Sequence, residues 1–202
     1  MSLLASLYRP ADQVLRSVQP LDGLAPLLMR LYLAPVLMQA GWNKLMAFDD
    51  TVAWFGNPAW GLGLPMPELM AALAAGTEFF GAWLLIFGFA VRWVSIPLMF
   101  IMMIAALSVH WENGWLAIAD ASSWLANDRV ADSAERLEAA RSILQEHGHY
   151  DWLTGRGSFV ILNNGIEFAA TYFLMLLSLF FTGGGRYLSL DYWLARHHGL
   201  LR

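Results

Sequence analysis

A glutamate lies deep inside one of the most apolar stretches of the chain. Glu78 falls in an apolar run from about Met66 to Ala90, which is about as long as a helix that crosses a bilayer. A carboxylate at that depth is costly unless it faces protein, water or a charged partner. A second glutamate, Glu167, opens the last long apolar run. The sequence therefore predicts two membrane helices that each bury a carboxylate.

The composition is that of an integral membrane protein. Of the 202 residues, 58% are hydrophobic and only 14% are charged, whereas soluble domains are about 25% charged. Four apolar runs predict spanning helices at about 26–47, 66–90, 93–112 and 159–182. The expected fold is an all-α, integral membrane four-helix bundle that forms one domain over residues 1–202. A turn-rich loop is expected at 48–67 and a long outer loop at 113–158.

The long loop between the third and fourth spans carries a helical pattern of its own. Apolar residues recur at helical spacing between Val130 and Leu144, among many charged residues. Asp128 is a candidate N-cap, and Gly148 is a candidate stop. The pattern predicts a surface helix from about Val130 to Glu146.

The basic residues near the spans predict the orientation of the chain. Most of them fall on the side of the two termini: Arg9, Arg16, Arg92, Arg186, Arg196 and Arg202. We therefore expect both termini in the cytoplasm and the long loop outside.

Several kinds of site are excluded by what the sequence lacks. The chain has no cysteine, so it has no disulfide, thiolate metal site or CxxC relay, and it has no haem or iron–sulfur motif. No basic tract predicts binding to nucleic acid. His147 and His149 flank a glycine beside Glu146 and leave metal binding open, but two histidines and an acid are a weak signal. No metal ligand is predicted.

One ionisable residue per predicted span falls at a common depth. Counted at about 1.5 Å per residue from the predicted cytoplasmic ends, all four lie roughly 21–25 Å into their helices; they are Lys44, Glu78, His110 and Glu167. Since exposure to lipid is costly for each, we expect them to converge inside the bundle, with Lys44 as the counter-ion of the glutamates and His110 or Asn164 as hydrogen-bond partners. Asn43, Asn163 and Asn164 lie close to this layer.

Structural explanations for the same residues stay open. Lys44 is able to snorkel to the outer interface, and His110 to sit above the core. A Lys–Glu lock between helices would need no function. Arg30 lies about a turn from the cytoplasmic surface, where it would serve as an anchor.

The motifs along the chain resemble those of the DoxX family of small four-helix membrane proteins. The resemblance covers most of the chain outside 113–158. It rests on four groups of residues: Arg30 with Gly41-Trp42-Asn43-Lys44-Leu45; Phe55-Gly56 to Leu64-Pro65; Glu78-Phe79-Phe80-Gly81 with Leu84, Leu85, Gly88 and Arg92; and Asn164-Gly165-Ile166-Glu167 with Gly183 to Asp191. It implies a bacterial inner-membrane location. The long outer loop is similar to that of the HvfX-like branch, which is associated with copper-responsive peptide systems.

Some members of the family are quinone-linked redox subunits, and others accompany oxidative-stress or metal-stress proteins. A quinone-interacting subunit is the first hypothesis, because a buried carboxylate beside a histidine is suited to relaying protons. The expected catalytic residues are Glu78, Glu167, His110 and Lys44, and the expected cofactor-binding residues are Asn43, Asn164 and Arg30. Electrons would come from a partner or a substrate.

The alternative hypothesis is a non-enzymatic accessory protein of a copper- or oxidative-stress system. Its outer loop would dock a periplasmic or membrane protein partner, and its spans would contact membrane lipids. A third possibility is a structural subunit whose charges only lock the bundle.

Overall fold

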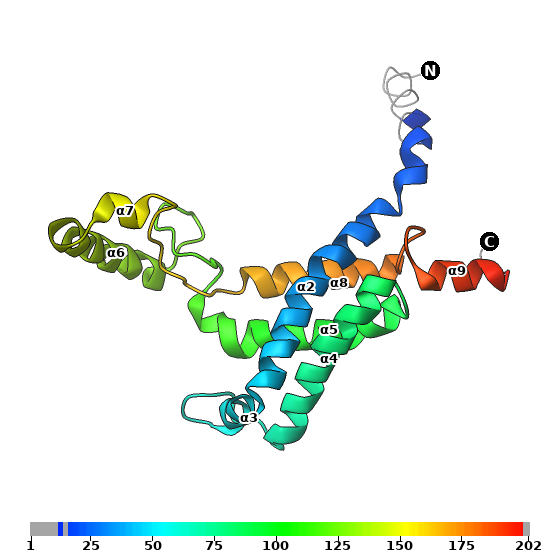
Figure 1. The fold of residues 1–202 in the computed structure, drawn as a ribbon, viewed down its shortest axis with the longest axis horizontal. Helices are drawn as coiled ribbons and strands as arrows, with labels where there is room; N and C mark the ends of the chain where they lie inside the picture. Colours follow the sequence, from blue (N-terminus) through cyan, green and yellow to red (C-terminus); the bar gives the residue numbers. More distant parts are fainter. Residues whose placement is uncertain (1–11, 14–15, 200–202) are drawn as a thin grey trace. The chain divides into compact units, whose positions relative to one another are not determined.

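The computed structural model describes residues 12–13 and 16–199, and this part is built from helices (Figure 1). The elements are η1 Gln19–Leu21, α2 Leu24–Met46, α3 Phe48–Gly56, α4 Pro67–Phe87, α5 Val91–Ile104, the π-helix η2 Ala105–His110, η3 Trp111–Asn113, α6 Asp128–His147, α7 Tyr150–Thr154, α8 Glu167–Thr182 and α9 Leu190–His197. Within the described ranges, β-structure is limited to an isolated bridge between Ile118 and Leu162. The expected all-α fold is confirmed.

Three helical stretches of the described chain are long and apolar enough to cross a membrane. They are Arg16–Met46, Pro67–Phe87 and Val91–Asn113, which match the first three expected spans. The fourth apolar helix, α8, has 16 residues and is therefore about 24 Å long, shorter than a hydrocarbon core of about 30 Å. The fourth crossing, and with it the four-helix count, stays a prediction.

Helix α8 begins at Glu167 rather than near residue 159, because the preceding segment pairs with another loop. The N–H groups of Asn163 and Asn164 both donate to the carbonyl of Ala117. Asn164 has a φ of +60°, which no α-helix accommodates. An ideal Cβ on Gly165 would lie 2.5 Å from the carbonyl oxygen of Leu116. Apolar composition alone does not distinguish this extended segment from a helix.

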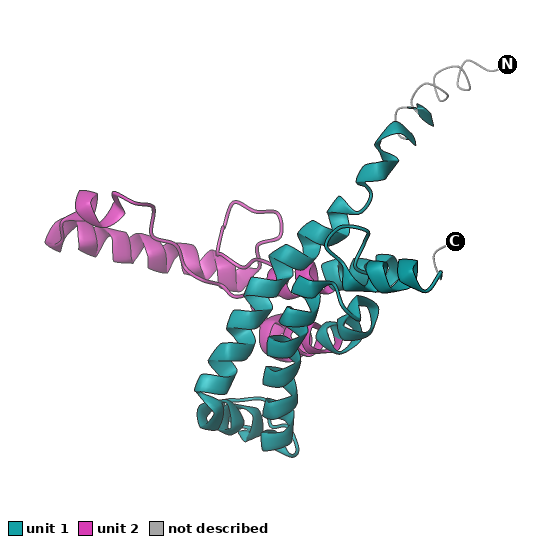
Figure 2. Cartoon of the chain, turned by 45° about the vertical axis from the view of Figure 1, so that its right-hand side comes forward, with its two compact units in different colours: residues 1–99, 174–202 teal, residues 100–173 magenta. Residues whose placement is uncertain are grey.

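The described chain divides into two compact units (Figure 2). Unit 1 comprises residues 1–99 and 174–202, and unit 2 comprises residues 100–173. The sequence predicts one domain, because nothing in its composition marks a boundary within α5 or α8. Each unit is described by itself below.

The core of unit 1 is the seam between α2 and α4, which pack along their lengths. Leu33 and Leu37 of α2 are fully buried, as are Ala71, Ala75 and Leu85 of α4. Alanines let the two backbones approach closely, as small residues do in membrane helix pairs. Gly81, also on α4, gives the same close approach to Val94 and Leu98 of α5.

At Gly41 the backbones of α2 and α4 approach closely. An ideal Cβ there would lie 2.5 Å from the backbone nitrogen of Phe79 and 2.8 Å from the carbonyl oxygen of Ala75. We predict that Gly41→Ala lowers the free energy of unfolding by about 2 kcal/mol, because the helices must separate. Denaturant titration of purified protein measures this effect.

Gly76→Ala is the matched control on α4. The nearest atom to an added Cβ there is 4.0 Å away. This change should be neutral or should stabilise by up to about 1 kcal/mol through helix propensity. Equal effects of the two substitutions would contradict the close approach at Gly41.

Each of the two expected loops contains a helix. The loop expected at 48–67 contains α3, whose first turn carries Asp49 and Asp50, where carboxylates stabilise a helix start. The helix expected from about Val130 to Glu146 is confirmed as α6, although its N-cap is Asn127 rather than Asp128. Gly148 ends α6 as expected.

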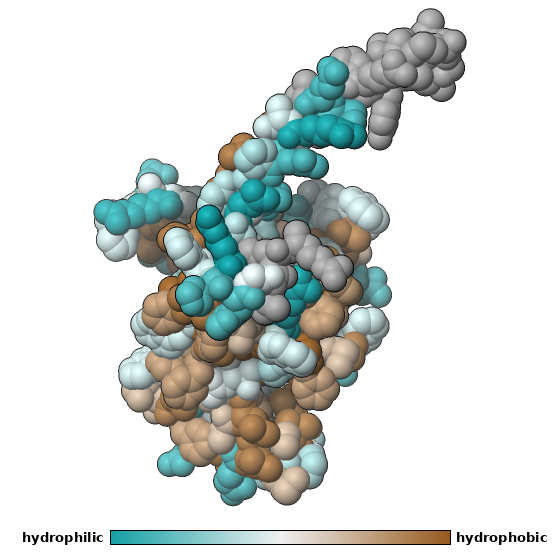
Figure 3. Space-filling view, turned by 90° about the vertical axis from the view of Figure 1, so that its right-hand side faces the viewer, coloured by the Kyte–Doolittle hydropathy of each residue, from teal (hydrophilic) through white to brown (hydrophobic). Residues whose placement is uncertain are grey.

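Large apolar side chains cover much of the surface of the described chain. Figure 3 shows brown, apolar side chains over much of the face that it presents. Phe80 of α4 and Leu28 of α2 are both more than 60% exposed. Exposed apolar surface of this extent on long helices fits contact with lipid.

Candidate functional site

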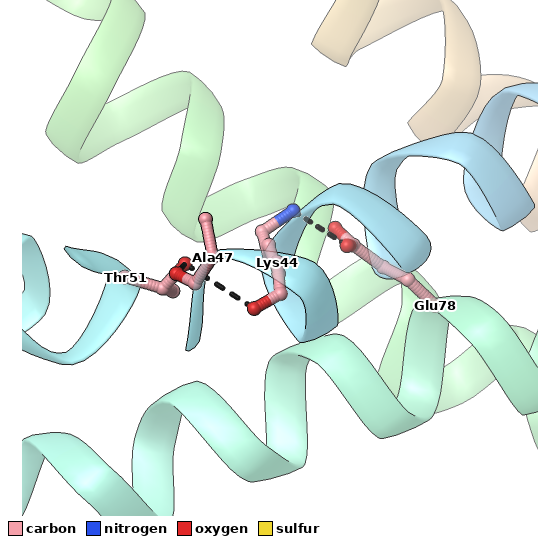
Figure 4. A network of polar contacts seen from close by, with 4 residues as sticks. All are labelled: Lys44, Ala47, Thr51 and Glu78. Carbon is pink, nitrogen blue, oxygen red and sulfur yellow. Dashed lines mark hydrogen bonds and ion pairs between the residues drawn. The ribbon is translucent and has the colours of Figure 1, made fainter. Parts of the chain in front are cut away.

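Lys44 of α2 and Glu78 of α4 form an ion pair across the seam of unit 1. The Lys44 Nζ lies 2.5 Å from the Glu78 Oε2 (Figure 4). The Glu78 side chain is 4% exposed and the Lys44 side chain is 26% exposed. The carboxylate is thus enclosed by protein, while the ammonium group is reached from outside. The expected Lys44–Glu78 ion pair is present.

The end of α2 holds Lys44 in place. The helix stops at Ala47, and the chain turns directly into α3. The Thr51 hydroxyl of α3 donates to the carbonyl of Ala47 at 2.8 Å and approaches the carbonyl of Lys44 at 3.4 Å (Figure 4). These bonds join the first turn of α3 to the end of α2, where the Ala47 carbonyl also accepts from the Thr51 N–H. The ammonium group therefore projects from a fixed backbone.

Two aromatic rings lie within two residues of the ion pair along the same two helices. Trp42 of α2 and Phe79 of α4 have ring centroids 5.8 Å apart. Trp42 is about half exposed. Asn43, an expected cofactor-binding residue, is also exposed. The α2–α4 seam at this level thus combines a cation, a carboxylate and exposed aromatic surface.

Arg30 has a structural role in unit 1. It is fully buried, and its guanidinium donates to the carbonyls of Leu85 and Tyr187 at 3.0 and 2.8 Å. It also reaches the carbonyls of Ile86 and Leu188. Only its Nε is left without a hydrogen-bond partner among the described residues. Arg30 ties the end of α4 to the segment that follows α8, and cofactor binding by Arg30 stays a prediction.

Asp191 was not singled out by the sequence, although it belongs to the C-terminal motif. Its carboxylate accepts hydrogen bonds from the N–H groups of Ala90 and Val91, at the start of α5. Ser189, which is buried, donates to the carbonyl of Gly88. The Gly183 to Asp191 motif thus fixes the turn between α4 and α5. The motif lies about a hundred residues after that turn, and nothing in the sequence indicates that the two segments are in contact.

His110 and Asn164 lie together in unit 2. The His110 Nδ1 is 2.8 Å from the carbonyl oxygen of Asn164, so Nδ1 carries the proton of this hydrogen bond. His110 ends the π-helix Ala105–His110, a rare geometry that is frequent at functional sites.

Glu167 bonds to backbone in unit 2. Its Oε2 accepts from the N–H of Ala117 at 2.9 Å. Asn163 lies nearby in sequence, and its buried amide donates to the carbonyls of Asn113 and Leu116 while accepting from Arg129 of α6. These bonds fasten the loop after η3 to the start of α8. Convergence of Glu167 and His110 with Lys44 and Glu78 in one layer stays a prediction.

Part of the chain matches a known protein family. Residues 25–111 match the family model DoxX. This part of the chain is therefore similar to a DoxX domain. That range includes Arg30, Lys44, Glu78 and His110, and it ends before the Asn164–Glu167 and Gly183–Asp191 motifs. No curated protein and no solved structure matches the chain.

The similarity to DoxX and the long apolar helices indicate a membrane protein. Across the described ranges, no group of three or more His, Cys, Asp or Glu side chains is arranged to hold a metal ion. His147 and His149 are both exposed, at the end of α6 and just before α7.

Proposed function

We propose that this DoxX-domain protein binds a quinone head group at the Lys44–Glu78 pair and serves as a redox subunit of the bacterial inner membrane. The observation that carries the proposal is the ion pair itself, a carboxylate that the protein encloses and an ammonium group that is partly open. Both termini would lie in the cytoplasm, which puts the pair toward the outer face. Membership of the HvfX-like branch belongs to the same proposal.

The donor set fits a quinone. An ammonium group has three N–H donors, and Glu78 takes one of them. The remaining two are available to a carbonyl oxygen of the ring. Trp42 and Phe79 offer aromatic surface on the same seam, which suits a flat conjugated ligand.

Glu78, ionised in its pair with Lys44, would then lie near the bound ring. When bound, a quinone supplies two-electron chemistry coupled to two protons. Lys44 would orient the ring carbonyl and donate a proton to it, and Glu78 would stabilise the ammonium form of Lys44 through which each of the two protons passes. The electrons come from a partner protein or a substrate.

Quinone retention tests the proposal. We predict that protein purified in mild detergent retains quinone, and that Lys44→Met lowers the retained amount at least about tenfold, since a charged hydrogen bond is worth about 1.5–3 kcal/mol. Mass spectrometry of extracted lipids, normalised to protein, measures retention.

Glu68→Gln is the control for that experiment. Glu68 is exposed and lies in the first turn of α4, away from the ion pair along the same helix. It should retain quinone like the unsubstituted protein. Absence of quinone from the unsubstituted protein, or equal retention by Lys44→Met, would contradict the proposal.

A second candidate function is that of a non-enzymatic accessory protein of a copper- or oxidative-stress system. The observation that favours it is α6, a helix of 20 residues in which Val130 is the one buried residue. A helix that packs so little of itself within its own unit has surface to offer a periplasmic partner. Crosslinking from exposed α6 positions, with no quinone retained, would favour this function over the first.

A further inference from the structure

A groove of about 690 Å³ opens in unit 1 at the far end of α2 from Lys44. Its walls come from the start of α2, the start of α5, the end of α8 and α9, all parts of unit 1 (Figure 2). Pro26 lines the groove, and Lys44 lies 18 residues further along the same helix, about 27 Å away. The groove is therefore separate from the proposed quinone site.

The charged groups of the groove leave one cation uncompensated. Arg186 pairs with Asp22 at 2.7 Å. Asp191 accepts two backbone hydrogen bonds at the start of α5 and lies near the buried Arg30. Arg92 is exposed and has no ion pair or hydrogen bond within the part of the chain that the structure describes.

The guanidinium of Arg92 lies against a turn of three glycines. An ideal Cβ on Gly183 would be 3.1 Å from the Arg92 Nε. Gly183 and Gly185 have φ values of +74° and +71°, while Gly184 between them is not left-handed. The N–H groups of Gly184, Gly185 and Arg186 find no backbone acceptor among the described residues. Successive free N–H groups in such a turn form a concavity that binds anions.

The groove lies at the ends of two helical stretches that are long and apolar enough to cross a membrane. Helix α4 ends at Phe87 and α5 begins at Val91, so the connection between two spanning stretches forms part of its wall. Trp93, also in the wall, is 76% exposed. Tryptophan at the end of a spanning helix is typical of the headgroup level. Lipid phosphates lie at this level, with acyl chains running beside the helices.

We propose that this groove binds the phosphate of an anionic glycerophospholipid. Arg92 contributes a charged donor, the Gly183–Arg186 turn contributes backbone N–H groups, and Trp93 lies against the glycerol and upper acyl region. Glycine is required in the turn because Gly183 and Gly185 have positive φ. An arginine beside free backbone N–H groups is a combination suited to phosphate oxygens.

Lipid binding by the full chain in detergent tests this proposal. Native mass spectrometry would compare phosphatidylglycerol with phosphatidylcholine as the added lipid. We expect phosphatidylglycerol to bind more tightly, and Arg92→Gln to weaken its binding about tenfold by removing one charged contact. Arg92→Lys should weaken it less. Arg196→Gln, on the exposed last turn of α9, should leave it unchanged.

Circular dichroism of each variant separates lost binding from lost folding, and Arg92 is exposed enough to be replaced without unfolding. Equal phosphatidylglycerol binding by Arg92→Gln and the unsubstituted protein would overturn the proposal. So would displacement of the lipid by millimolar inorganic phosphate, because the anion would then be a soluble phosphate. Lipid binding that survives inorganic phosphate and depends on Arg92 supports the lipid as occupant.

Discussion

Replacing Arg30 with methionine should lower the free energy of unfolding by about 4 kcal/mol, since each buried carbonyl left unpaired costs about 1–3 kcal/mol. Methionine fills much of the same length without a donor. It would remove the bonds to the carbonyls of Tyr187 and Leu85, of which Leu85 keeps its bond from the Gly88 N–H, together with the weaker contacts to Ile86 and Leu188. The midpoint of unfolding in mixed micelles measures the loss.

Two further variants sharpen this prediction. Arg30→Lys keeps the charge but lacks the planar fork that reaches α4 and the C-terminal segment together, so it should restore less than half of the loss. Arg196→Met is the surface control and should change stability by no more than about 0.5 kcal/mol. A loss below about 1 kcal/mol for Arg30→Met would show that water replaces the lost bonds.

The sequence predicted the α2–α4 ion pair because the cost of burial leaves few alternatives for Glu78. A short carboxylate side chain does not reach the membrane surface, so it needs a partner at its own depth, and Lys44 lies at that depth. The long stems of arginine and lysine weaken such reasoning. For Arg30, the sequence favoured an anchor at the surface, whereas the side chain is fully buried against backbone carbonyls.

The sequence did not predict the contacts between distant segments in which one partner is a backbone group. Asp191 meets Ala90 and Val91 across about a hundred residues, and Asn163 meets Asn113 and Leu116 across about fifty. Backbone N–H and C=O groups occur at every position, so they leave no mark in the sequence. The late start of α8 has the same origin, since the loop before it pairs through its backbone.

Replacing Lys44 should lower the free energy of unfolding more than replacing Glu78. Lys44→Met leaves an enclosed carboxylate, which is 4% exposed, without its counter-ion. We expect a loss of about 3 kcal/mol in the free energy of unfolding. Glu78→Gln leaves an ammonium group that is already 26% exposed and is able to extend toward water. We expect a loss of about 1 kcal/mol, because glutamine still accepts the hydrogen bond.

The double variant Lys44→Met/Glu78→Gln completes the cycle. It removes both charges together, so its loss should be smaller than the sum of the two single losses by about 2 kcal/mol. Additive losses would mean that the two charges do not interact in the folded protein.

Glu78→Gln also distinguishes a purely structural ion pair from a ligand-binding site. If this variant folds with nearly normal stability yet retains no quinone, the carboxylate acts on a ligand. A purely structural ion pair would leave the amount of retained quinone unchanged in a variant of normal stability.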